Sequence, residues 1–266
     1  MTTTAPVPAY AVVRARLGLV GLLLGLAALA WWVTAERMAG MDAGPGTNLG
    51  AIGWFLGVWI VMMAAMMLPS VAPTAALYAQ RAGTRGWRRP LMFTTGYLLV
   101  WSAAGVVAYG IFSLGRDAFG SALAWHSGGR WLAAGILVAA ALFELTPSKQ
   151  RCLRECRSAP RSSTDGALAA LRSGAANGAW CLGCCSGLMA ALFALGVMSL
   201  TWMTVIAVLI AVEKMISWPR AATWGSAALL AVIAVGLLAA PHSVPGLVVP
   251  GGGHHGVSMP SMNTMG

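Results

Sequence analysis

The sequence predicts an all-α protein: a polytopic membrane bundle of about seven transmembrane helices, with the N-terminus inside the cell and the C-terminus outside. Hydrophobic residues make up 58% of the 266 residues and charged residues only 9%, whereas soluble domains carry about 25% charged residues. Seven apolar segments follow one another with short links, and the basic residues gather in alternate links.

Each apolar segment is long enough, or nearly so, for a membrane helix, since a bilayer core needs roughly 20 apolar residues. Trp or Tyr marks many of the segment ends, as in interfacial belts. Pro69 and Pro73 predict a kink or a break in the second segment. The fifth and sixth segments, joined around Ser199, predict a tight hairpin. The segments are 17–33, 54–79, 91–114, 131–146, 180–198, 200–218 and 221–240.

The orientation follows from the Lys and Arg residues. Fourteen of the 17 lie in one set of links and only Arg37, Arg116 and Arg130 lie in the other. Because cytoplasmic loops carry the basic excess, the N-terminus is expected in the cytoplasm. The net charge of +10 has this source, so no nucleic-acid partner is expected.

The first segment has an alternative interpretation. Arg14, Arg16, the following apolar run and the small residues at 28–30 also resemble a cleaved signal peptide. Trp31 and Trp32 directly afterwards favour a membrane anchor instead. Cleavage would leave six spans in the same orientation.

Three regions are expected along the chain: a cytoplasmic N-terminus at 1–16, one transmembrane domain at 17–240, and an extracytoplasmic tail at 241–266. The tail is rich in Gly, Pro, His and Met, a composition that predicts disorder. The link at 147–179 is basic and predicts an inner loop with a short helix at 165–175.

Soft ligands occur on the predicted outer face, where all four His residues of the chain fall. Thioether and imidazole groups suit copper. The alternative is that these Met and His residues are incidental to a flexible tail and a membrane edge. The candidate ligands are Met38, Met41, His126, His254 and His255.

Four methionines of the second segment form a second candidate group near the expected bilayer midplane. Met62 and Met66, and Met63 and Met67, are four residues apart and line adjacent helix stripes. Such thioethers are possible Cu(I) ligands, although Met also fills irregular cores.

Five cysteines form the third group, on the predicted cytoplasmic side. Cys181, Cys184 and Cys185 share one face at the inner end of the fifth helix, and Cys152 and Cys156 share one if their stretch is helical. Together they offer thiolates for Cu(I) or zinc. The alternative is packing of free Cys as a small apolar residue.

Two acidic residues, Glu144 and Glu213, lie near predicted inner helix ends. Structural pairing is one role for them, and a proton or metal site is another, above all for Glu213. The sequence lacks a phosphate-binding loop and the H-E-x-x-H and G-x-S-x-G motifs, so no enzyme activity is predicted.

Several motifs together resemble the bacterial predicted metal-binding integral membrane protein family of unknown function. They lie at 59–70, 145–156, 181–185, 196–198 and 213–214, within a similarity that covers about residues 50–218. The resemblance implies a multi-pass plasma-membrane protein that binds a metal, with copper the leading expectation.

The leading hypothesis is therefore a multi-pass protein of the bacterial inner membrane that binds a metal ion, copper or else zinc, and handles it or delivers it to a partner. That partner would be a periplasmic metalloprotein or a membrane complex, besides the lipid bilayer itself. The alternative is a structural or assembly subunit without bound metal. A membrane redox enzyme ranks last, because no quinone or haem ligand pattern accompanies the cysteines.

Overall fold

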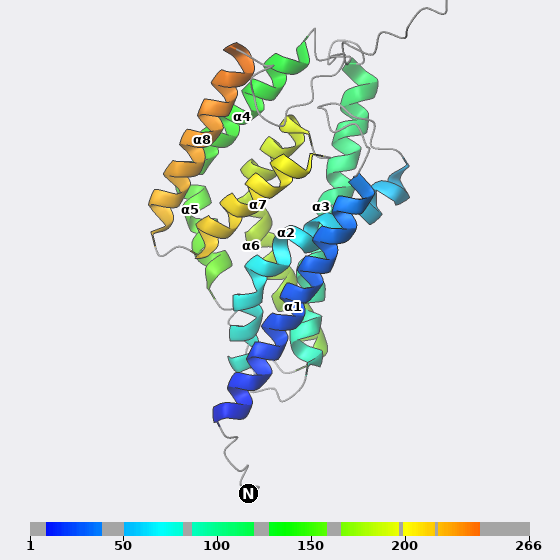
Figure 1. Cartoon of the computed structure of the whole chain (residues 1–266), viewed down its shortest axis with the longest axis vertical. Helices are drawn as coiled ribbons and strands as arrows, with labels where there is room; N and C mark the ends of the chain where they lie inside the picture. Colours follow the sequence, from blue (N-terminus) through cyan, green and yellow to red (C-terminus); the bar gives the residue numbers. More distant parts are fainter. Residues whose placement is uncertain are drawn as a thin grey trace, which may run out of the picture.

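The computed structural model describes residues 9–38, 51–81, 87–119, 128–158, 166–196, 199–215 and 218–239. Within these ranges the chain forms eight α-helices and no β-strand, which confirms the predicted all-α class (Figure 1). The helices are α1 (Ala9–Met38), α2 (Ile52–Arg81), α3 (Arg88–Phe119), α4 (Arg130–Glu144), α5 (Pro147–Arg157), α6 (Ala167–Leu195), α7 (Leu200–Met215) and α8 (Pro219–Ala239).

Five of the described helices are long and apolar enough to cross a membrane: α1, α2, α3, α6 and α8. A sixth candidate is the pair α4 and α5, bent by 67° at its junction. Helix α7 has 16 residues, fewer than the roughly 20 that a bilayer core needs. The count of seven spans and their orientation therefore stay predictions.

The predicted inner loop at 147–179 contains more helix than expected, since the helix predicted at 165–175 is present from residue 167 as the start of α6 and α5 is an additional helix. Helix α5 occupies its first part, and α6 begins at Ala167, well before the predicted start at residue 180. Thr146 caps α5 by accepting a hydrogen bond from the Lys149 amide at 3.2 Å, and Pro147 takes the first helical position. Lys149 and Arg172 lower the hydropathy of this region, but both residues lie within helices.

Helix α2 runs as one helix through Pro69 and Pro73, so of the predicted kink or break the break does not occur. Figure 1 shows the helix changing direction along its course. Its residues are the most buried among the candidate spans, followed by those of α6. These two helices form the centre of the bundle.

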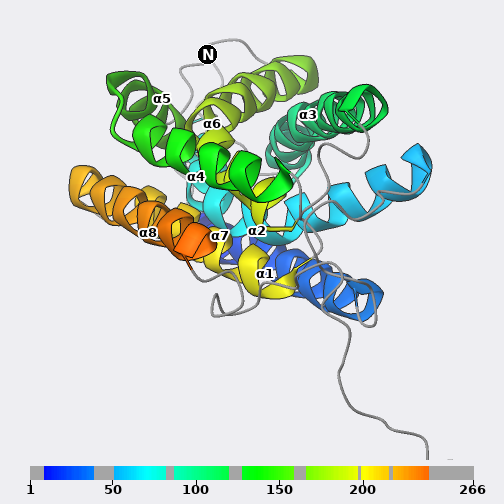
Figure 2. The same ribbon diagram turned by 90° about the horizontal axis from the view of Figure 1, so that it is seen from above.

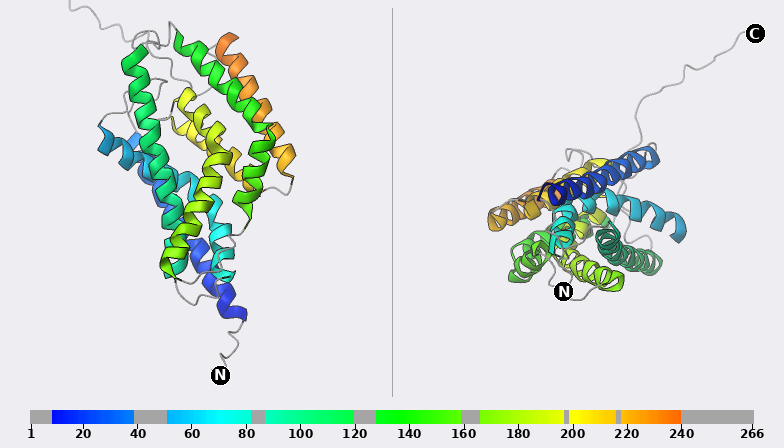
Figure 3. Two further views of the ribbon diagram at one scale, coloured as in Figure 1. Left: turned by 180° about the vertical axis from the view of Figure 1, so that it is seen from behind. Right: turned by 90° about the horizontal axis from the view of Figure 1, so that it is seen from below.

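The other helices pack around this centre, two of them along α2 or α6 and two along each other. Helix α1 lies along α2, α3 along α6, and α4 along α8 (Figures 2 and 3). Helix α7 contacts α2, α6 and α8, and the Glu213 side chain near its C-terminal end is buried. Most of α3 faces outward, with large apolar side chains such as Leu99 and Ile111 exposed.

Helices α3 and α6 approach each other closely at two glycines. A Cβ on Gly174 would overlap the backbone of Phe93, and one on Gly96 would overlap the backbone of Leu171. Small residues permit such close helix packing. This contact fixes α6, with its three cysteines, against the stretch of α3 that carries Tyr97.

We expect Gly174→Ala to destabilise the protein by about 1–3 kcal/mol, the usual cost of overpacking. The added methyl group meets backbone, which cannot rotate away, so α3 and α6 must separate. Thermal denaturation of the detergent-purified chain measures the effect. Gly135→Ala is the matched control, because a Cβ there meets nothing within 4 Å. Equal stability of the two variants would contradict the close approach.

Reporter fusions test the orientation. A reporter enzyme that is active only outside the cytoplasm should be active when fused after Gly266 and inactive when inserted between α5 and α6, since the basic excess marks the latter as cytoplasmic. A second reporter, active only in the cytoplasm, should give the complementary pattern. The opposite result for both fusions would reverse the sidedness of every candidate site.

Candidate metal centre

Four thiols from two helices meet in the interior. Cys181, Cys184 and Cys185 share one face of α6, as their spacing predicts, and Cys156 reaches them from α5. The sulfurs of Cys156, Cys181 and Cys184 all lie within 4.8 Å of one another. The Cys185 sulfur lies 3.9 Å from that of Cys181 and 3.6 Å from that of Cys184. None of the four residues is more than 4% exposed, so the cluster is shielded from water.

The fifth thiol, Cys152, lies outside this cluster. It is on α5, one turn before Cys156, and is half-buried. Its sulfur lies 3.1 Å from the position that a Cβ on Gly183 would take. The missing side chain at Gly183 therefore lets α5 lie close against α6. All five cysteines are free thiols.

The cysteines lie deeper along their helix than predicted. We expected them at the inner end of the fifth segment, but α6 begins at Ala167 and Cys181 lies near its middle. The prediction was wrong because it began the helix at the end of the basic stretch. The consequence is that thiols expected at the membrane edge lie in the core of the bundle.

The sulfur of Cys181 receives two further polar contacts. The Lys214 ammonium on α7 donates to it at 2.9 Å, and the Tyr97 hydroxyl on α3 lies 2.9 Å away. Lys214 also donates to the Ser70 hydroxyl on α2 at 3.2 Å. Because an ammonium group can only donate, the Cys181 sulfur acts as an acceptor, and the positive charge stabilises negative charge on it.

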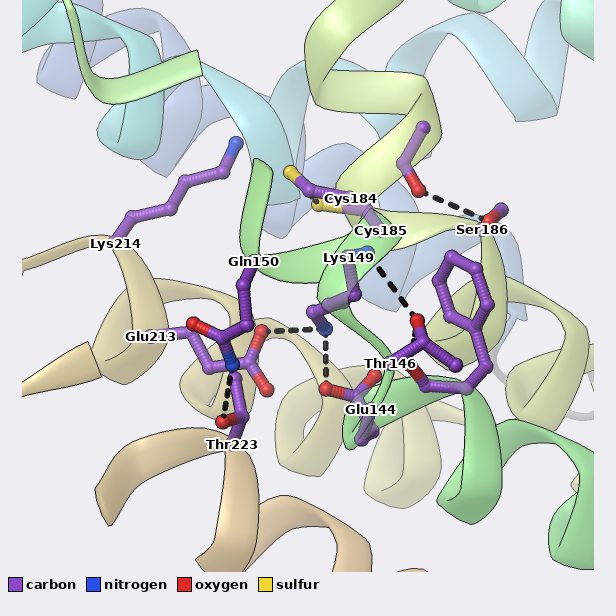
Figure 4. Close-up of polar contacts among 12 residues, drawn as sticks. Glu144, Thr146, Lys149, Gln150, Cys184, Cys185, Ser186, Glu213, Lys214 and Thr223 are labelled. Carbon is purple, nitrogen blue, oxygen red and sulfur yellow. Dashed lines mark hydrogen bonds and ion pairs between the residues drawn. The ribbon is translucent and has the colours of Figure 1, made fainter. Parts of the chain in front are cut away.

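A second lysine, Lys149, is fully buried and holds two carboxylates at the junction of α4, α5 and α7 (Figure 4). Its ammonium donates to Glu144 and, at 2.8 Å, to Glu213. No residue of the three is more than 2% exposed. One oxygen of each carboxylate has no hydrogen-bond partner among the described residues. Lys149 is placed here by the Thr146 cap, which starts α5 immediately after α4.

Glu213, for which both structural pairing and a proton or metal role were predicted as alternatives, is paired with Lys149 in this structure, and its role as a ligand stays a prediction. Figure 4 shows it directed toward Lys149, whereas the next residue, Lys214, extends toward the Cys184 side. The two side chains leave α7 in different directions because consecutive helical residues are about 100° apart. Carboxylate and thiol groups thus form neighbouring but separate sets.

The four candidate methionines of α2 are all buried, at most 3% exposed. Ser70, one turn beyond Met67, donates to its carbonyl at 2.9 Å and accepts from Lys214. The backbone of Met67 is therefore linked to the Cys181 sulfur through Ser70 and Lys214, although no thioether takes part in these contacts. Met62, Met63, Met66 and Met67 remain candidate ligands.

The partners of several residues in these two polar groups could not be predicted from the sequence. Tyr97 lies 84 residues from its partner Cys181, in an ordinary apolar run. Lys149 was counted among the basic residues that set the orientation and lies in the motif at 145–156 that carries the family resemblance, but neither observation predicted its two carboxylate partners. Ser70 and Lys214 are 144 residues apart. Pairs of this kind arise from helix packing and have no local periodicity.

The structure does not describe the side chains of the predicted outer ligands. Met41, His126, His254 and His255 fall outside the described residues, and Met38 ends α1 with its side chain outside the described part. The outer-face group therefore stays a prediction.

Comparison with known proteins places the chain in a family. No curated protein and no solved structure matches it. The sequence profile of the PpoB2 family, described as copper chaperone, matches residues 56–237. That stretch covers most of the chain and includes all five cysteines and the four methionines of α2. The metal-related character that the resemblance implied is thereby supported, and the chain belongs to the PpoB2 copper chaperone family.

Proposed function

We propose that this chain is a multi-pass membrane protein that binds Cu(I) on buried thiolates and delivers it to a copper-dependent partner. The observation that carries the proposal is the three sulfurs of Cys156, Cys181 and Cys184 within 4.8 Å of one another. Cys185 is a further donor beside them. The family supports copper as the cargo.

The donor set fits Cu(I). Soft thiolates select Cu(I), zinc and iron–sulfur clusters, whereas hard cations take oxygen ligands. The carboxylates nearby are held by Lys149, which leaves the sulfurs as the donors of this centre. A structural zinc ion takes four ligands, and four thiols are present, so zinc is the competitor to be tested against Cu(I).

The charge of the site also suits a monovalent ion. Cu(I) bound by two deprotonated thiols, with the other thiols of the cluster protonated, carries a net charge of −1, which an apolar interior tolerates only when it is compensated. The Lys214 ammonium, 2.9 Å from the Cys181 sulfur, supplies that compensation. Because ligating thiols must lose their protons, loading of such a site releases protons.

The setting that we propose is the bacterial plasma membrane. Long apolar helices and the outward apolar surface of α3 support insertion in a bilayer, and the basic links support an inside N-terminus. Residues 17–240 then form the membrane domain, 1–16 lie in the cytoplasm, and the His- and Met-containing tail at 241–266 lies outside, on the side of the proposed partner.

The first test is the triple variant Cys156→Ser, Cys181→Ser, Cys184→Ser. We expect it to lose stoichiometric Cu(I), because a serine hydroxyl is a poor ligand for this soft ion. Metal content after anaerobic Cu(I) loading measures the loss, and circular dichroism checks that the helices remain. Zinc loading in parallel identifies the preferred metal.

The matched control is Cys152→Ser, which removes a thiol on the same helix but outside the cluster. It should bind Cu(I) like the wild type. A wild-type protein that takes up no Cu(I) under reducing conditions would refute the proposed function.

The second test is Lys214→Gln. Without the ammonium the copper–thiolate unit carries an uncompensated buried charge, so we expect its Cu(I) affinity to fall by at least about tenfold, equivalent to about 1.4 kcal/mol. Competition with a chromogenic Cu(I) chelator measures the affinity.

Two controls separate charge from packing. Lys214→Arg keeps the positive charge and should retain most of the affinity, and Ser70→Ala removes the other hydrogen-bond partner of Lys214 without changing any charge. Equal affinities in Lys214→Gln and the wild type would show that this ammonium does not balance the site.

A further inference from the structure

A row of buried side chains continues along α6 beyond the thiol cluster. Cys181, Cys185, Met189 and Phe193 follow one another at intervals of four residues, so each side chain lies next to the following one and the row turns around the helix by about 40° per step. Cys181 is 0%, Cys185 1% and Met189 6% exposed. The row therefore passes from two thiols to a thioether and ends at an aromatic ring.

A matching row lies on α2. Trp59, Met63 and Met67 are spaced by four residues, and Ser70 follows one turn later. At 3.6 residues per turn, Trp59, Met63 and Ser70 point within about 40° of one another. Met63 is 1% and Met67 0% exposed, so both thioethers are in the interior.

Two contacts set the register of these rows. At one end Lys214 joins Ser70 on α2 to Cys181 on α6, at 3.2 and 2.9 Å. At the other end the rings of Trp59 and Phe193 lie 5.6 Å apart. The helices are therefore antiparallel here, and at about 1.5 Å per residue both segments between the contacts measure about 17 Å.

This register brings particular residues to the same level. Counting from both ends, Met67 lies level with Cys185, and Met63 lies level with Met189. The thioethers of α2 and α6 thus lie at matching levels, one to two turns along the bundle from the Cys181 sulfur, with Cys185 between the two groups.

We propose that Met63, Met67 and Met189 form a second Cu(I) site, made of thioethers, and that Cu(I) passes between this site and the thiolate centre. The proposal rests on the proposed function, since the copper comes from or goes to the thiols. It adds Met189 as a ligand and gives the copper a path along α2 and α6.

The two sites differ in how tightly they hold the ion. Thioethers are soft and favour Cu(I), but they are uncharged, so the ion keeps its full charge in an apolar setting, which is costly. The thioether site is therefore the weaker one and suits transfer rather than storage. Beyond it, the rings of Phe55, Trp59, Tyr109 and Phe193 pack at centroid distances of 5.3–5.7 Å and close the row.

The competing explanation is that these methionines only fill the core. Leu and Met have similar volumes and exchange at small cost, but Leu has no sulfur. Replacing Met63, Met67 and Met189 by Leu therefore removes the ligands and keeps the packing. Met203→Leu is the matched control, because Met203 on α7 is fully buried but belongs to neither row.

The experiment uses the full chain in detergent, loaded with excess Cu(I) under anaerobic reducing conditions. Bound copper is counted before and after a strong Cu(I) chelator, and thermal denaturation checks the fold of each variant. We expect the wild type and Met203→Leu to hold a tight equivalent, which resists the chelator, and a weak one. The triple Leu variant should lose the weak equivalent alone, and the triple Ser variant of Cys156, Cys181 and Cys184 should lose the tight one alone.

A triple Leu variant that keeps the weak equivalent would overturn the second site while leaving the proposed function intact. Absence of the tight equivalent from the wild type would instead refute the proposed function. Should the triple Leu variant unfold, Met189→Leu alone decides the question: the weak equivalent must bind less tightly than in Met203→Leu, and equal binding overturns the proposal.

Discussion

A charge inside an apolar bundle must meet an opposite charge, and this requirement organises the interior of the protein. Lys149 satisfies it with Glu144 and Glu213, and Lys214 satisfies it beside the Cys181 sulfur. The pairs do not add much stability by themselves, because desolvation consumes most of the attraction. Breaking one is costly, however, since the remaining charge would be buried alone. They therefore determine where α4, α5 and α7 must lie.

The thiol cluster depends on the same constraint. Three of its thiols come from one face of α6 and would lie together in any fold of that helix, but Cys156 comes from α5. Lys149 is two turns before Cys156 on α5, so the ion pairs that hold Lys149 also hold Cys156 against α6. Gly183 completes the contact by leaving room for Cys152. A structural ion-pair group and a candidate copper site are in this way parts of one arrangement.

Features set by residues close together in the sequence could be predicted, whereas contacts between residues far apart in the sequence could not. The shared face of Cys181, Cys184 and Cys185 and the apolar helices followed from spacing and composition. The partners Tyr97 and Lys149 did not, because they meet their targets through helix packing. The error over 147–179 has the same origin: we treated charged residues as ends of the apolar segments, whereas Lys149 is compensated inside the bundle and the helix continues around it. A charged residue lowers the hydropathy of a segment, but it can still be buried when an opposite charge compensates it.

The arrangement of sulfur along α6 also determines how copper would move. Successive positions of the row rise by about 6 Å, so Cys181, Cys185 and Met189 offer donors at regular short steps on one rigid helix. Near Cys181 the ammonium of Lys214 favours anionic thiolate ligands, and farther along no cation among the described contacts accompanies the thioethers. The free energy of bound Cu(I) thus rises along the row, from compensated thiolate to neutral thioether. Net transfer from the thiolate centre then requires an acceptor that binds the ion more tightly than the thiolates do, with the thioether site as an intermediate step, and a chaperone that gives up its cargo only to such a partner avoids releasing free copper.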